Sequence, residues 1–229
     1  LAPLALVGRS VETHVGYLVL ASLGGLVVPA LLLAILQQEN DTARAAEVLE
    51  LIVKQFPTKK DYWPQLWATY LNLASDKDET KARDNFVRAI NTVERAQAQG
   101  FMNTPKDNFN LVGIYFNMQQ YDQAIALLEK GLRDGSIDSE QRNWELLAAS
   151  LQQVRREARA IDVLKEATKQ FPDSGSLYLT IAQIYYSLDK LEDSYSFARQ
   201  AVTHKLDKPW QAYTFLAYIC FELKKFSEA

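Results

Sequence analysis

The chain has 229 residues, of which 48% are hydrophobic and 23% charged, as in an ordinary globular protein with a continuous core. Its formal net charge of -3 argues against a nucleic-acid-binding protein, which usually carries a basic face or stripe. A single cysteine, Cys220, excludes an internal disulfide and a metal site built from several thiolates.

The first notable segment is apolar and runs from Val15 to Leu36 without a charged residue. Its length would suffice for a membrane-spanning helix. Gly24-Gly25 and Pro29 interrupt it, however, as a turn between two helices would. We therefore treat residues 1–28 as an apolar N-terminal segment, and a partial repeat, a membrane span and a signal segment all remain open for it.

From residue 29 onward one pattern repeats. A small residue recurs at intervals of 34 to 42 residues, at Ala45, Ala82, Ala124, Ala160, Ser194 and Ala229. A large aliphatic residue lies thirteen positions earlier in most units, at Leu32, Leu111, Leu147, Ile181 and Leu216, while Leu66 lies sixteen before Ala82. The apolar residues follow helical spacing throughout, and no stretch alternates as a strand would, so the pattern predicts an all-helical chain.

Proline and glycine mark the ends of the predicted units. Phe56-Pro57, Gly100, Gly135 and Phe171-Pro172 each end a helix, because proline cannot continue one and glycine favours its termination. Thr104 to Asp107 has the order of a helix N-cap, with proline at the first helical position. The resulting units are about 29–59, 60–103, 104–137, 138–173, 174–208 and an incomplete 209–229, the second having a longer turn and an extended second helix.

This order and near-34-residue period resemble the tetratricopeptide repeat (TPR), a helix–turn–helix unit. The resemblance implies an all-α TPR-type α-solenoid, in which antiparallel helical hairpins form a right-handed superhelix. Small residues let paired helices approach closely, and units stack because none can bury its apolar side alone. Such chains hold protein partners, so we expect a non-catalytic interaction scaffold and no enzyme.

The reactive side chains give no contrary signal. His14 and His204 are far apart in the sequence and have no ligands at metal-binding spacing. No Gly-rich phosphate loop is present. We predict no catalytic residue, metal or cofactor, a solvated loop position for His204 and a buried, inert thiol for Cys220.

A partner-binding surface is predicted on the first helices of the units, which line the concave face of TPR solenoids. Aromatic and amide side chains there suit an extended segment or a helix of a protein partner. The candidates are Phe109, Phe116, Gln152, Gln183, Tyr186, Tyr218 and Phe221. The alternative is that some of these rings pack under neighbouring units. The basic clamp of co-chaperone repeats, which grips a C-terminal carboxylate, is absent, because its positions hold Phe109, Gly113, Glu145 and Ala149.

Residues 62 to 229 also resemble a narrower group, the bacterial TPR proteins encoded beside TonB, ExbB and ExbD. The resemblance rests on short tracts: Tyr62-Trp63, Gln65-Leu66, Gly100-Phe101, Leu128 to Leu132 with Gly135 and Ile137, Asn143, Leu146-Leu147, Ala160-Ile161, Val163 to Ala167, Leu177-Tyr178, Ala182-Gln183, Leu188 to Lys190 and Gln211 to Tyr213. It implies a periplasmic adaptor that contacts a TonB-type energy-transduction or transport complex of the bacterial envelope, near the membrane and without nucleic acid.

Two alternatives stay open at this point. The first is a membrane-anchored assembly factor in which residues 15–36 span the bilayer. The second is a TPR regulatory domain of a larger enzyme or transcription regulator.

Overall fold

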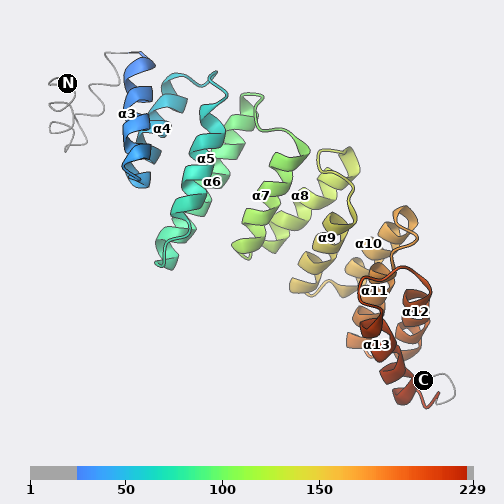
Figure 1. The fold of residues 1–229 in the computed structure, drawn as a ribbon. Coiled ribbons are helices and arrows are strands. Elements are labelled where there is room, and N and C mark those ends of the chain that lie inside the picture. The colour runs from blue at the N-terminus through green and yellow to red at the C-terminus, as the bar shows by residue number, and fades with distance from the viewer. Residues whose placement is uncertain (1–24, 226–229) are drawn as a thin grey trace. The chain divides into compact units, whose positions relative to one another are not determined.

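A computed structural model describes residues 25–225, which consist of helices joined by short turns (Figure 1). These residues contain no β-strand, apart from an isolated bridge between Ser174 and Lys205. The all-helical prediction is therefore confirmed. The helices are α3 (Val27–Gln38), α4 (Thr42–Gln55), α5 (Tyr62–Leu73), α6 (Glu79–Ala98), α7 (Pro105–Asn117), α8 (Tyr121–Asp134), α9 (Gln141–Gln153), α10 (Glu157–Gln170), α11 (Gly175–Ser187), α12 (Leu191–Thr203) and α13 (Pro209–Glu222).

The chain divides into two compact units, Leu1–Ile114 and Tyr115–Ala229. In the first unit α3 packs on α4, α4 on α5 and α5 on α6. In the second unit each helix from α8 to α13 packs on the next one. Each unit is thus a stack of antiparallel helical hairpins, the arrangement of a TPR solenoid.

The core of each unit is built from the predicted pairing of large and small residues. The aliphatic positions Leu66, Leu147 and Ile181 are at most 2% exposed. The small residues Ala124, Ala160 and Ser194 are fully buried, and Ala45 is 4% exposed. Close packing at these positions follows, since a small side chain on one helix leaves room for a large one on its neighbour.

The second hairpin departs from the predicted register. Ala82 is only half-buried, whereas Ala89 and Ala96 of α6 are fully buried, so the assignment of Ala82 to the core was wrong. The physical reason is the length of α6. The side chain of Asn85 donates to the carbonyl oxygen of Leu73, the last residue of α5, at 3.3 Å. Residues of α6 before Asn85 therefore extend past the end of α5, and a later segment of the helix packs against it.

The turns inside the other hairpins share one backbone conformation. A non-glycine residue with positive φ lies eight positions after the core aliphatic residue in each of them, at Asn40, Gln119, Arg155, Asp189 and Lys224. The next residue donates its N–H to a carbonyl of the first helix, as Arg156 does to Leu151 at 2.9 Å. This is the left-handed C-terminal motif that satisfies orphan carbonyls at a helix end. In the α5–α6 hairpin the equivalent residue, Ala74, is right-handed.

The start of α7 has the N-cap that the sequence predicts. At the start of α7, Thr104 and Asp107 form the predicted cap: the Asp107 N–H donates to Thr104 Oγ1 at 3.2 Å, and the Thr104 N–H donates to Asp107 Oδ2 at 3.1 Å. Two of the four orphan donors of a helix start are satisfied in this way.

The apolar stretch near the start is divided by the structure. Gly25 lies in a turn at φ +57, and α3 begins at Val27. Leu33 and Leu36 are buried in the packing of α3 on α4, so this part of the stretch belongs to a helical hairpin. Among the helices of residues 25–225, none is both long and apolar enough to cross a membrane. Residues 1–24 and Ala229, about which predictions were also made, lie outside the described part.

Candidate functional site

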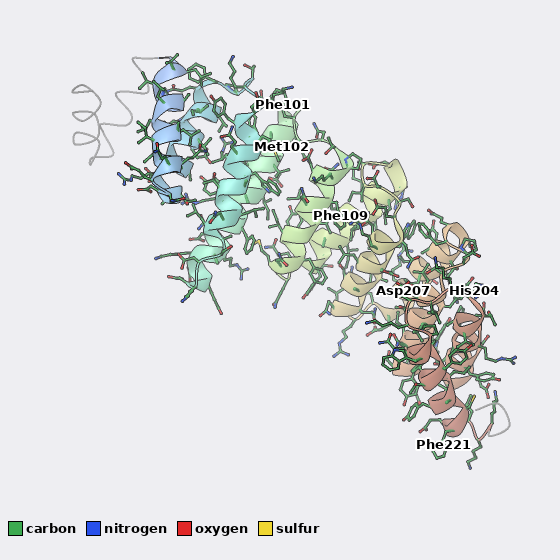
Figure 2. All side chains as sticks on the ribbon, viewed as in Figure 1. Phe101, Met102, Phe109, His204, Asp207 and Phe221 are labelled. Carbon is green, nitrogen blue, oxygen red and sulfur yellow. The ribbon has the colours of Figure 1, made fainter. Side chains whose placement is uncertain are left out.

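The predicted partner-binding residues fall on first helices in both units. Phe109 lies on α7 within the first unit and is half-buried (Figure 2). The second unit holds the other six: Phe116 at the end of α7, Gln152 on α9, Gln183 and Tyr186 on α11, and Tyr218 and Phe221 on α13.

The structure brings two of these residues into direct contact. The Tyr186 hydroxyl donates to the Tyr218 hydroxyl at 3.1 Å, and their ring centroids are 5.7 Å apart in an edge-on arrangement. Phe215 contributes a third ring, 5.8 Å from Tyr186. We call Tyr186, Phe215 and Tyr218 the aromatic cluster of α11 and α13, and Phe221 follows Tyr218 by three residues on α13. Edge-to-face rings of this kind fix one another's orientation.

The aromatic cluster is open to solvent at its α13 side. Tyr218 is 47% and Phe221 65% exposed, and Phe221 is labelled near the end of α13 in Figure 2. The hydrogen bond to Tyr186 and the nearby carboxylate of Glu222 raise the pKa of Tyr218 to about 12. Tyr218 therefore keeps its proton at neutral pH and presents an uncharged ring and hydroxyl.

Three of the predicted residues, Phe116, Gln152 and Gln183, do not belong to the aromatic cluster. Phe116 packs edge-on against Tyr121 of the following helix, with ring centroids 5.2 Å apart, and is half-buried. The Gln152 amide reaches the carbonyl of Ala148 in its own helix at 3.5 Å. Gln183 is exposed on α11.

A polar group on the same first helices was not predicted. The Gln141 amide donates to Glu145 Oε1 at 2.7 Å and to Ser176 Oγ at 2.9 Å, and Ser176 Oγ donates to Glu145 Oε1 at 3.2 Å. These three residues join the start of α9 to the start of α11, beside a cavity of about 450 Å³ also lined by Ser174 and Lys205. The available signal in the sequence was their place on first helices: Gln141 and Glu145 lie six and two residues before Leu147, and Ser176 lies five residues before Ile181.

The first unit has a separate groove, between its second helices. A cavity of about 710 Å³ is lined by residues of α4, α5 and α6, among them Glu50, Tyr70 and Arg88. The Tyr70 hydroxyl donates to Glu50 Oε1 at 3.0 Å, and Arg95 pairs with Glu50 Oε2 at 2.9 Å. Burial and the Glu50 carboxylate raise the pKa of Tyr70 to about 12. The extension of α6 past α5 forms one wall of this groove.

The reactive side chains discussed from the sequence, Cys220 and His204, pack against other residues of the fold. Cys220 is fully buried in a core cluster with Ala198 and Ile219, as predicted. His204 stacks on Tyr178 with ring centroids 4.6 Å apart, and its Nδ1 lies 2.6 Å from the carbonyl oxygen of Gln200. Within residues 25–225, His, Cys, Asp and Glu side chains form no group of three or more that could hold a metal ion. His14 lies outside these residues.

Comparison with known proteins supports the repeat assignment. Two family models described as tetratricopeptide repeat match residues 30–59 and 108–133. No curated protein matches the chain. The first match covers most of α3 and α4, and the second covers most of α7 and α8.

Solved structures show the same fold at low sequence identity. YrrB, described as a TPR protein with an unusual peptide-binding site, is 12% identical over 84% of this chain and 88% of its own, with a TM-score of 0.51. A MamA protein is 17% identical over 71% and 85%, with a TM-score of 0.50. The MamA fragment from Desulfovibrio magneticus RS-1 is 16% identical over 70% and 87%, also at 0.50. The chain thus contains tetratricopeptide repeats and has the fold of a TPR solenoid.

Proposed function

We propose that this chain is a non-catalytic scaffold that binds a protein partner through the first helices of its second unit. The observation that carries the proposal is the exposed side of the aromatic cluster, where Tyr218 and Phe221 lie 47% and 65% exposed on one helix. Partly exposed aromatic residues are typical anchors of protein interfaces, because they bury a large area at a small cost in side-chain entropy.

The polar group at the start of α9 and α11 supports the same surface. Gln141 and Glu145 offer an amide and a carboxylate on α9, and Ser176 offers a hydroxyl on α11, which also carries Gln183 and Tyr186. An extended peptide or a helix exposes backbone or side-chain groups that such residues recognise, while its apolar side chains contact the rings. YrrB, a solved structure of the same fold, is described with a peptide-binding site.

The proposed partner is a TonB-type energy-transduction or transport complex, and the proposed location is the periplasm of a bacterium. Both come from the resemblance of residues 62–229 to TPR proteins encoded beside TonB, ExbB and ExbD. Cross-linking in the native organism, followed by mass spectrometry, tests them. Recovery of TonB, ExbB or ExbD peptides is expected, and exclusive recovery of cytoplasmic proteins would overturn this location and partner.

A photo-cross-linking amino acid tests the surface itself. Placed at Tyr218 or Phe221 in the full chain, it should capture the same partner, while the same group at Lys169, exposed on α10, should not. The Tyr218→Asp, Phe221→Asp double variant should weaken binding of that partner by at least about tenfold, because two apolar anchors become charged. Ser196→Asp, exposed on α12, is the matched control. Equal capture from Lys169, or equal binding by the double variant and Ser196→Asp, would remove the surface from the proposal.

A further inference from the structure

The outer side of α3 carries an apolar stripe that no described helix covers. Val27, Leu31 and Ile35 follow one another at four-residue spacing and are 67%, 59% and 36% exposed. Residues at this spacing lie on one face of a helix, so the stripe is continuous along α3. The opposite side of α3 is different, since Leu33 and Leu36 are at most 3% exposed against α4.

Later repeats show what lies at the position of Ile35, whereas the positions of Val27 and Leu31 are half-buried or exposed in α9, α11 and α13. Ile35 comes three positions after the core aliphatic residue Leu32, and the residues at that position in α9, α11 and α13 are Ser150, Ile184 and Ile219. They are 0%, 2% and 0% exposed. Their helices pack on the second helix of the preceding repeat, α8, α10 and α12 in turn.

The contact between α12 and α13 shows which residues meet on this side. Ile219 of α13 lies in one core cluster with Tyr195 and Ala198 of α12. The side of a first helix on which Ile35 lies is therefore the docking side for a preceding second helix. Of the four first helices α3, α9, α11 and α13, only α3 has an exposed residue at this position, Ile35.

The chain itself supplies a segment of suitable chemistry directly before α3. Residues 15–23 read VGYLVLASL and carry no charge. Within them Gly16, Leu20 and Leu23 have the spacing of four and three that Ala45, Leu49 and Ile52 have in α4, where all three are at most 4% exposed. In α4 a small residue followed by two large ones at this spacing forms the buried face of a second helix.

The length of the segment also fits. The second helices α8, α10 and α12 have 14, 14 and 13 residues, and residues 10–23 would match them. Residues 24–26 would then form the connection to α3, including Gly25 in its turn at φ +57. The connection from α10 to α11 is comparably short, at residues 171–174.

We propose that residues 10–23 pack as a second helix along Val27, Leu31 and Ile35 and complete the first repeat interface of the chain. Because the segment is tethered to α3 by a few residues, its effective concentration at the stripe is far above that of a separate partner. The occupant is thus this chain and not a bilayer or a second copy. The inference concerns the stability of the first unit and is independent of the proposed partner surface.

Thiol labelling of the full chain in detergent-free buffer tests the contact. Leu31→Cys should react with a maleimide at least about tenfold more slowly than Gln37→Cys, an exposed position of the same helix, because labelling requires local opening of the contact. The buried Cys220 sets the background, measured in the parent chain. Circular dichroism shows whether each variant keeps its helices. Equal labelling rates in two folded variants would overturn the proposal.

Paired cysteines then identify what covers the stripe. Leu31→Cys is combined with one cysteine at each position from 16 to 23 and oxidised at low protein concentration. Intrachain cross-links in the monomer that recur at three- and four-residue spacing support the packed helix. Cross-links between chains, with protection lost on dilution, would mean a second copy covers the stripe. Protection that requires phosphatidylcholine vesicles would mean a bilayer does. Either of these results would overturn the proposal.

Discussion

The α5–α6 hairpin of the first unit and the α9–α10 hairpin of the second solve the same packing problem with different lengths. Helix α10 has 14 residues and places Ala160, Leu164 and Ala167 in the core. Helix α6 has 20 residues and buries Ala89, Val93 and Ala96, which have the same spacing. The interface set is kept while the chain between Leu66 and Ala89 is longer. The repeat is therefore defined by the spacing of its contact residues, and the number of residues in one repeat can vary.

The extra length has a local consequence in the first unit. The overhanging start of α6, with Lys81 and Asp84, forms a wall of the groove above Tyr70. In the second unit, the cavity beside Gln141 and Ser176 is smaller, at about 450 Å³, and one lined by Glu129 and Arg159 measures about 290 Å³. Irregular repeats thus create concave surface on the side of the second helices, where a regular repeat presents little.

The largest effect is expected where the register of α6 is tested. Ala89→Leu adds three carbon atoms at a fully buried contact and should lower the free energy of unfolding by about 3 kcal/mol, the upper end for overpacking. Ala82→Leu, at a half-buried position, should change it by less than about 0.5 kcal/mol. Urea unfolding of both variants gives the comparison. If Ala82→Leu were the more damaging one, the two hairpins would share a register after all.

A smaller effect is expected at the connection between α10 and α11. A Cβ on Gly175 would lie 2.7 Å from the carbonyl oxygen of Ala201, so Gly175→Ala should cost about 1–2 kcal/mol. Gly113 in α7 has nothing within 4 Å of the same atom, and Gly113→Ala should stabilise the helix by about 0.5–1 kcal/mol. Thermal unfolding should shift in opposite directions for the two variants. Parallel shifts would show that the close approach at Gly175 does not limit the second unit.

The smallest effect is expected for two ion pairs between neighbouring repeats. Glu50–Arg95 in the first unit and Glu129–Arg159 in the second join helices at 2.9 and 3.2 Å, and their side chains are 28% to 55% exposed. Glu50→Gln and Glu129→Gln should each cost about 0.5 kcal/mol, reduced further in 1 M salt. Glu50 also accepts from Tyr70, so its variant should keep the larger loss in salt. Identical salt responses would contradict a special role for the Glu50 contacts.

Much of the fold could be predicted from sequence, because large and small residues repeat at helical spacing. The cap at Thr104 was predicted from the order of residues 104–107, and the burial of Cys220 from the burial habit of free cysteine. The register of α6 could not be, since Ala82, Ala89 and Ala96 are seven residues apart and each satisfies the pattern. Only the length of the turn and the position of Asn85 decide between them.

The candidate site was partly accessible in the same way. Tyr186 and Tyr218 could be assigned to one surface because they occupy first helices of successive units, and their contact at 3.1 Å agrees with that. The link between Gln141, Glu145 and Ser176 could not be predicted, because it depends on side-chain conformations at the starts of α9 and α11. The packing of Phe116 on Tyr121 was missed for the same reason.

The left-handed turns described above have a consequence for how this chain can change. Five different side chains, Asn40, Gln119, Arg155, Asp189 and Lys224, adopt one backbone geometry at one place in the hairpin. The joint therefore accepts several different polar residues in the left-handed conformation, so its sequence can change without a change in the backbone. From Gln119 onward, the segment between two successive joints is a second helix and the first helix that follows it, so exchange of that segment would preserve the directions in which the chain enters and leaves.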